Sequence, residues 1–121
     1  MKADSSANLL EVYYSGKVCV ADLETSFSNI ETLIAKLRPG FTIFTDLSQL
    51  DSMELGCVDH ITKAMKCIGE HGVQRVVRVI PDPSKDIGFN ILSLFHYPRE
   101  VQILTCETIE EAKKALLGIE L

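Results

Sequence analysis

The sequence predicts one α/β domain over residues 1–121, in which a mixed, mostly parallel sheet is covered by helices. Strand-like and helix-like segments alternate along most of the chain, an order that is typical of parallel sheets. The chain opens with two β-prone segments on either side of a glycine, which adds an antiparallel hairpin. With 121 residues and 46% hydrophobic content, it is long and apolar enough for one continuous core.

A hairpin and an amphipathic helix are predicted for the first third of the chain. Residues 8–14 are β-prone, the turn over Ser15–Lys17 contains a glycine that permits positive φ, and residues 18–20 begin a second short strand. Asp22 is a typical N-cap for the next helix, which ends at Pro39–Gly40. Apolar residues at spacings of four and three give this helix one buried stripe. The stripe consists of Leu23, Phe27, Ile30, Ile34 and Leu37.

A central strand, a polar loop and a second helix are predicted for the middle of the chain. Residues 41–44 are apolar on both faces, as in a strand with neighbours on each side. The segment from Asp46 to Ser52 is polar, and we expect a short loop there. A helix over residues 53–71 follows and ends at Gly72. Its predicted core stripe consists of Val58, Ile61, Met65 and Ile68.

The last third predicts two more strands and two more helices. Residues 73–80 form an apolar strand, and residues 85–97 form a helix that ends before a proline. Residues 101–105 form the last strand. Thr108 and Glu111 have the spacing of a capping box, which predicts a final helix. The residues of this helix that we expect to face inward are Ile109, Ala112 and Leu116.

The composition argues against several classes of protein. The net charge of −5 does not suit binding to the phosphates of nucleic acids. No apolar run approaches the roughly 20 residues that a transmembrane helix needs, and the first residues lack the pattern of a secretory signal. The four cysteines have no CxxC spacing, so we expect reduced, mostly buried thiols and a cytoplasmic location. No cofactor is expected.

The segment from Phe41 to Gly56 carries a family resemblance. It contains Asp46-Leu47-Ser48 after a buried strand, then Asp51-Ser52, then Leu55-Gly56. In these residues, and in its order of elements, the chain resembles STAS domains, the family of the anti-sigma factor antagonists. The resemblance implies a SpoIIAA-like fold and a regulatory role, with a partner-binding surface that is switched by phosphorylation of Ser52 or Ser48.

The same resemblance implies a position for the phosphate. Ser52 would lie at the N-terminus of the second helix, where free backbone N–H groups and the helix dipole accommodate a phosphate. The alternative is that Ser52 is a plain helix N-cap, which contributes about 1 kcal/mol of stability.

A polar cluster is predicted at the edge of the sheet where the parallel strands end, which is the usual ligand-binding edge of open α/β sheets. Arg78 lies in an otherwise apolar strand, and a buried arginine needs a carboxylate, for which Asp46 is the nearest candidate. A structural ion pair or an exposed arginine is the alternative. No nucleophile with an adjacent histidine base is visible here, so an enzyme is not expected. The other predicted members are Ser48, Asp51, Asp82 and Thr105.

The predicted helix over residues 85–97 is apolar around most of its circumference. Ile91, Leu94 and Phe95 lie on its broad apolar face, whereas Phe89 and Leu92 lie away from the centre of that face. Such a helix must be covered on more than one side. The candidates for this cover are a second copy of the chain, another protein, a small apolar or lipid ligand, and loops of the same chain.

A metal site on the second helix is not expected. Cys57, His60, Cys67 and His71 share one stripe of this helix. However, His60 and His71 lie about 16 Å apart at 1.5 Å per residue, and metal–ligand bonds are only about 2 Å long. Half-sites such as Cys57 with His60 would need ligands from elsewhere.

The sequence therefore favours a non-enzymatic regulatory or protein-interaction module with a protein partner of unknown identity. One alternative is a carrier or sensor that holds a small apolar molecule or lipid against the helix over residues 85–97. A second alternative is an enzyme that uses Asp46 and Arg78.

Overall fold

The computed structural model describes residues 1–80, 97 and 100–117. The predicted helix over residues 85–97 lies outside this range except for its last residue, and so does Asp82. The described elements are β1 (Lys2–Asp4), β2 (Leu9–Val18), α1 (Val20–Phe27), α2 (Ile30–Ile34), β3 (Thr42–Met53), α3 (Cys57–Glu70), β4 (Arg75–Val79), β5 (Gln102–Cys106) and α5 (Ile109–Leu116).

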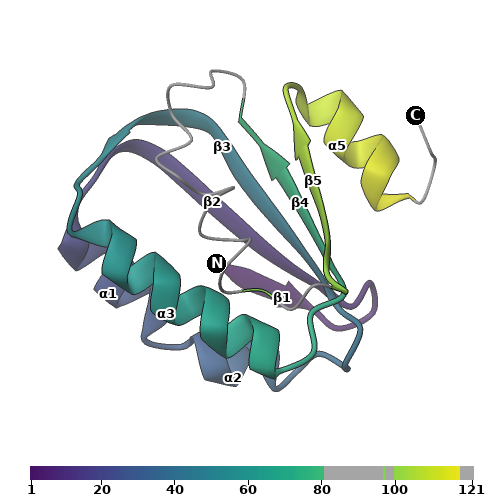
Figure 1. Ribbon diagram of the computed structural model, residues 1–121. Coiled ribbons are helices and arrows are strands. Elements are labelled where there is room, and N and C mark those ends of the chain that lie inside the picture. Colours follow the sequence, from purple (N-terminus) through teal and green to yellow (C-terminus); the bar gives the residue numbers. More distant parts are fainter. Residues whose placement is uncertain (81–96, 98–99, 118–121) are drawn as a thin grey trace.

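The predicted mixed, mostly parallel sheet is confirmed. Its five strands are ordered β1-β2-β3-β4-β5, with β1 antiparallel to β2 and every other pair parallel. Helices α1, α2 and α3 cover one face of the sheet, and α5 lies on the other face against β4 and β5 (Figure 1). The central position of β3 is also confirmed.

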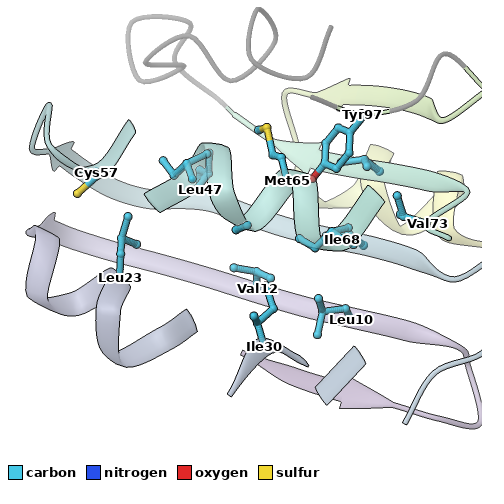
Figure 2. Close-up of a cluster of buried hydrophobic side chains, with 14 of the residues drawn as sticks. Leu10, Val12, Leu23, Ile30, Leu47, Cys57, Met65, Ile68, Val73 and Tyr97 are labelled. Atoms are coloured by element: carbon cyan, nitrogen blue, oxygen red, sulfur yellow. The ribbon is translucent and has the colours of Figure 1, made fainter. Parts of the chain in front are cut away.

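Two hydrophobic clusters hold these layers together. The larger cluster joins α1, α2 and α3 to one face of the sheet, and Figure 2 shows its members pointing inward from helices and strands alike. The smaller cluster joins Ala112 and Ala115 of α5 to Phe44, Val77 and Val79 on the other face. In β4, Val76 belongs to the larger cluster and its neighbour Val77 to the smaller one, since side chains alternate along a strand.

The predicted hairpin turn at Ser15–Lys17 is wrong, because β2 continues through these residues to Val18. Gly16 has a φ of +66°, and the pairing register shifts on either side of it because β3 has the extra residues there, so Gly16 lies on β2 opposite two irregularities of β3. The antiparallel hairpin lies one strand earlier, between β1 and β2. There Asp4 Oδ1 accepts hydrogen bonds from the backbone N–H groups of Ser6 and Ala7 at 3.1 Å.

We expect Gly16→Ala to lower the free energy of unfolding by about 1–2 kcal/mol, the usual cost of a left-handed conformation for an L-residue. A Cβ atom at Gly16 would meet nothing within 4 Å, so this cost is conformational and not steric. The measurement is urea unfolding, with Ser15→Ala at the exposed neighbouring position as the control. Equal effects of the two substitutions would contradict a requirement for positive φ at Gly16.

The first predicted helix is divided into α1 and α2, with a break at Ser28–Asn29. Ser28 Oγ donates a hydrogen bond to the carbonyl oxygen of Thr25 at 2.8 Å, and such side-chain bonds compete with helix continuation. The predicted apolar stripe still faces the core, because Leu23, Ile30 and Ile34 are buried. The N-cap of α1 is Cys19, so the prediction of Asp22 as N-cap is wrong by three residues.

The two later helices are close to their predictions. The stripe of α3 is confirmed for Ile61, Met65 and Ile68, although α3 begins at Cys57 and not at residue 53. In α5, Thr108 is the N-cap, and its Oγ1 accepts a hydrogen bond from the backbone N–H of Glu111 at 3.2 Å. Ala112 is buried as predicted, but Ile109 is 39% exposed, so its predicted inward orientation is wrong.

Candidate functional site

Strands β2 and β3 extend beyond their pairing with the rest of the sheet. The pairing of β3 with β4 ends at Asp46 and Val79, whereas β3 continues beside β2 as far as Met53 (Figure 1). We call residues 15–18 of β2 and 47–53 of β3 the strand extension. Its inward-facing residues on β3 recur every third position, because the bulged register replaces strict alternation. They are Leu47, Leu50 and Met53.

The predicted polar loop from Asp46 to Ser52 is therefore wrong, since all of these residues lie on β3. Ser52 is exposed and is paired in register with Lys17 of β2. Its predicted position at a helix N-terminus, as a cap or as a phosphate site, is also wrong, because α3 begins at Cys57 with Gly56 as its N-cap. Ser48 is half-buried, and its backbone N–H donates a hydrogen bond to Asp46 Oδ1 at 2.8 Å.

The segment between β3 and α3 is fixed against the start of α1. Glu54 Oε2 accepts a hydrogen bond from the backbone N–H of Val20 at 3.2 Å, and the Glu54 backbone N–H donates to the carbonyl oxygen of Val18 at 3.0 Å. A Cβ atom at Gly56 would lie 2.9 Å from Val20 Cγ2, so glycine permits this close approach. Leu55, the residue between Glu54 and Gly56, is 83% exposed.

We call Asp51, Ser52, Glu54 and Leu55 the β3–α3 corner. Leu55 differs from the other three because it is a large apolar side chain, which the anchored turn holds in water. The sequence analysis did not select Leu55 as a site residue. The sequence contained one signal for Leu55: it is apolar, lies outside the buried stripe of α3, and closely follows three polar residues, Asp51, Ser52 and Glu54.

Asp22 adds a further negative charge near this corner. Its Oδ2 accepts hydrogen bonds from the Cys19 backbone N–H at 2.9 Å and from Cys19 Sγ at 3.2 Å. These bonds stabilise the carboxylate and hold the pKa of Asp22 below its ordinary value of 3.8. The buried Cys57 thiol lies close to these acids, and burial first, then the charge of Glu54, raises its pKa.

We expect the contribution of Asp22 to stability to depend on pH in one direction. Because its folded pKa lies below the ordinary value, the contribution is present above pH 3.8 and is lost as the pH falls through the folded pKa. Asp22→Asn should therefore be less stable than the wild type at neutral pH and approach it at lower pH. Urea unfolding of both proteins along this pH series checks the result, and a difference that does not change with pH would contradict it.

The predicted pair of Asp46 and Arg78 is wrong. Arg78 is paired in register with Thr45, and Asp46 is paired with Val79. Since neighbouring residues of a strand face opposite sides, Asp46 shares a face with Phe44 and Val79 under α5, whereas Arg78 faces α3. The alternative of an enzyme that uses Asp46 and Arg78 does not fit this geometry, because the two side chains lie on different faces of the sheet.

A cavity of about 50 Å³ lies between the sheet and α3, on the face that carries Arg78. Arg78 is 2% exposed and Tyr97 is also buried. Burial raises the pKa of Tyr97 to about 12, and the charge of Arg78 and its hydrogen bond to the hydroxyl oppose this shift. Burial also raises the pKa of Tyr14. The described residues that line the cavity are Met1, Val12, Tyr14, Phe27, Ile43, Thr45, Ile61, Ala64, Met65, Ile68, Arg78 and Tyr97.

Other predicted features have less support or lie outside the described residues. The apolar surface of Ile91, Leu94 and Phe95 is outside this range, so the carrier alternative stays a prediction. Among the described residues, no group of three potential ligands gathers for a metal ion. His60 Nε2 lies 3.8 Å from Glu24 Oε1, and His71 Nδ1 lies 2.7 Å from the carbonyl oxygen of Cys67. Within the described ranges, no helix is long and apolar enough to cross a membrane.

The fold is similar to that of solved structures. One of them is a protein of the DUF3478 family from Shewanella loihica PV-4, which is described as uncharacterized and as having a SpoIIAA-like fold. Its TM-score is 0.68, with 18% sequence identity over 88% of this chain and 82% of that one. The unphosphorylated form of the anti-sigma factor antagonist SpoIIAA has a TM-score of 0.63 and 18% identity over 98% of both chains. No protein-family model and no curated protein matches the sequence. The protein has a SpoIIAA-like fold, as predicted from its STAS resemblance.

Proposed function

We propose that this protein is a non-enzymatic regulatory module that binds a protein partner through the β3–α3 corner. The observation that carries the proposal is the 83% exposure of Leu55 on an anchored turn. Large apolar side chains on a rigid scaffold are typical anchors of protein interfaces. The SpoIIAA-like fold supports the proposal, because one structure with this fold is an anti-sigma factor antagonist.

The charges near Leu55 indicate which partner surface fits. Glu54 and Asp22 are held at the start of α1 by their backbone hydrogen bonds, and Asp51 lies beside Ser52 on the strand extension. Lys17 is the nearby cation, paired in register with Ser52. Among the described residues here, Glu54 and Asp22 alone outnumber Lys17, so the partner should offer an apolar pocket for Leu55 with basic residues around it.

Phosphorylation of Ser52 is the proposed switch. Ser52 is exposed, so a kinase can reach its hydroxyl without opening the sheet. A phosphate there adds about 1.5 to 2 negative charges, which Lys17 attracts and Asp51 repels. The added charge would change the affinity for the partner, because it lies three residues from Leu55. Ser48 is the second candidate, but it is half-buried and less accessible.

Ser52→Glu tests the switch. We expect this variant to change partner affinity by about tenfold, since it places a carboxylate on the edge of the surface. Ser15→Glu is the control, because Ser15 is another exposed serine of the strand extension. Equal affinities of Ser52→Glu and the wild type, or equal changes in both variants, would leave the switch without support.

Photo-crosslinking from position 55 tests the proposed function itself. A photoreactive amino acid replaces Leu55 in one variant and Leu117, which is 77% exposed on the C-cap of α5, in the other. Both are introduced in the source cells, and the adducts are identified by mass spectrometry. We expect one protein to be captured from position 55 and not from position 117. The same capture from both positions, or none from position 55, would refute the proposal.

A further inference from the structure

Among the described residues, the lining of the cavity under α3 is mostly apolar and includes the polar side chains of Tyr14, Thr45, Arg78 and Tyr97. Thr45 and Arg78 are neighbours in register on β3 and β4, and both line the cavity. Tyr97 lines it too and accepts a hydrogen bond from Arg78. Figure 2 shows Met65 of α3 and Tyr97 in this layer of the core. Apolar side chains from α3 and β2 line the cavity as well, including Val12, Ile61 and Ile68.

The size of the cavity limits what it can hold. A volume of about 50 Å³ corresponds to about three to five water-sized groups, at about 10–15 Å³ each. Water alone is a poor occupant for most of this space, because buried waters need two to four polar partners and most of the described lining residues are apolar. A long lipid chain is too large. The fitting ligand has one polar group and a tail of about three carbon atoms.

We propose that this cavity binds a short-chain carboxylate of three or four carbon atoms, with its carboxylate at Arg78 and Tyr97 and its tail against α3. This site is separate from the β3–α3 corner, and no step of the proposed partner binding depends on it.

The chemistry of the polar lining residues favours a carboxylate over a neutral head group. Arg78 is a permanently charged group in a buried site, where charge-assisted hydrogen bonds are strong. The guanidinium has five N–H donors in a planar fork, so one arginine can serve more than one acceptor. Tyr97 is protonated at neutral pH like an ordinary tyrosine, and burial raises its pKa further, to about 12, so its hydroxyl can donate to the second carboxylate oxygen.

A titration that compares butyrate with 1-butanol tests the proposal. The two molecules have similar tails, and only butyrate carries the charge. Sodium chloride at equal ionic strength controls for salt effects, and amide NMR shifts are followed along the full chain. We expect saturable shifts around Val12, Thr45 and Ile68 with butyrate, and binding that is about tenfold weaker or absent with 1-butanol.

Two variants make the result specific to the cavity. Ala64 lines the cavity on α3, so Ala64→Leu should fill the space and abolish the saturable shifts. Tyr97→Phe removes one donor without removing the ring, and should weaken butyrate binding even if Ala64→Leu fails to fold. Leu55→Ala, at the exposed corner, should bind butyrate like the wild type. Equal binding of butyrate and 1-butanol, no saturable binding of butyrate, or unchanged binding by Tyr97→Phe would overturn the proposal.

Discussion

Replacing Leu23 by alanine is expected to lower the free energy of unfolding by about 2–5 kcal/mol. Leu23 is 0% exposed and belongs to the cluster that joins α1 to the sheet and α3. With eight residues, α1 is too short to be stable by itself, so it depends on this packing. Since a domain of this kind has a total stability of about 5–15 kcal/mol, the loss is a large share of it.

Urea unfolding followed by circular dichroism measures this loss. Leu117→Ala is the matched control, because it removes the same atoms from a side chain that is 77% exposed, and it should change stability by less than about 0.5 kcal/mol. A loss below about 1 kcal/mol for Leu23→Ala, or similar losses in both variants, would mean that α1 does not pack on the sheet as described.

Replacing Leu55 by aspartate is expected to weaken partner binding by about 30-fold or more, which corresponds to the 2 kcal/mol of an interface hot spot. The substitution puts a charge where an apolar pocket of the partner would desolvate it, and this cost outweighs any attraction to the basic residues around the pocket. The stability of the free protein should hardly change, because the side chain is exposed. Isothermal titration with the partner captured by crosslinking gives the affinities.

Leu117→Asp is the control for this prediction, since it introduces the same charge at another exposed leucine. It should leave the affinity within about twofold of the wild type, because added net charge alone has a small effect on binding at physiological salt. If both variants weaken binding alike, the effect is one of net charge, and the partner does not bind at the β3–α3 corner.

The alternation of apolar segments was sufficient to predict most of the fold. The apolar residues of α1, α2 and α3 recur at the helical period, because each of these helices buries one face. Strand β4 is a largely apolar run, because both of its faces are buried. The end of β3 was missed because it does not follow these periods. Leu47, Leu50 and Met53 are buried at every third position, and the residues between them are polar, which is typical of a loop in the sequence alone.

The candidate site was harder to predict, because it depends on register and on contacts between distant residues. A shift of one residue in strand pairing changes the face of every side chain, and the register places Asp46 and Arg78 on opposite faces. Gly16 was assigned to a turn because positive φ is common in turns, whereas here it lies within β2, opposite the bulged part of β3. The exposure of Leu55 depends on Gly56 and Glu54 packing against Val20, which is more than 30 residues away.

The most direct test of the central claim is a map of the partner-binding surface. The isotope-labelled protein is titrated with its partner, and changes in amide NMR signals are followed for the whole chain. We predict that the largest changes lie at the β3–α3 corner and at the start of α1, from Val18 to Asp22, with little change in α5. Changes that gather on α5, with the signals of Ser52 and Leu55 unaffected, would contradict the proposed function.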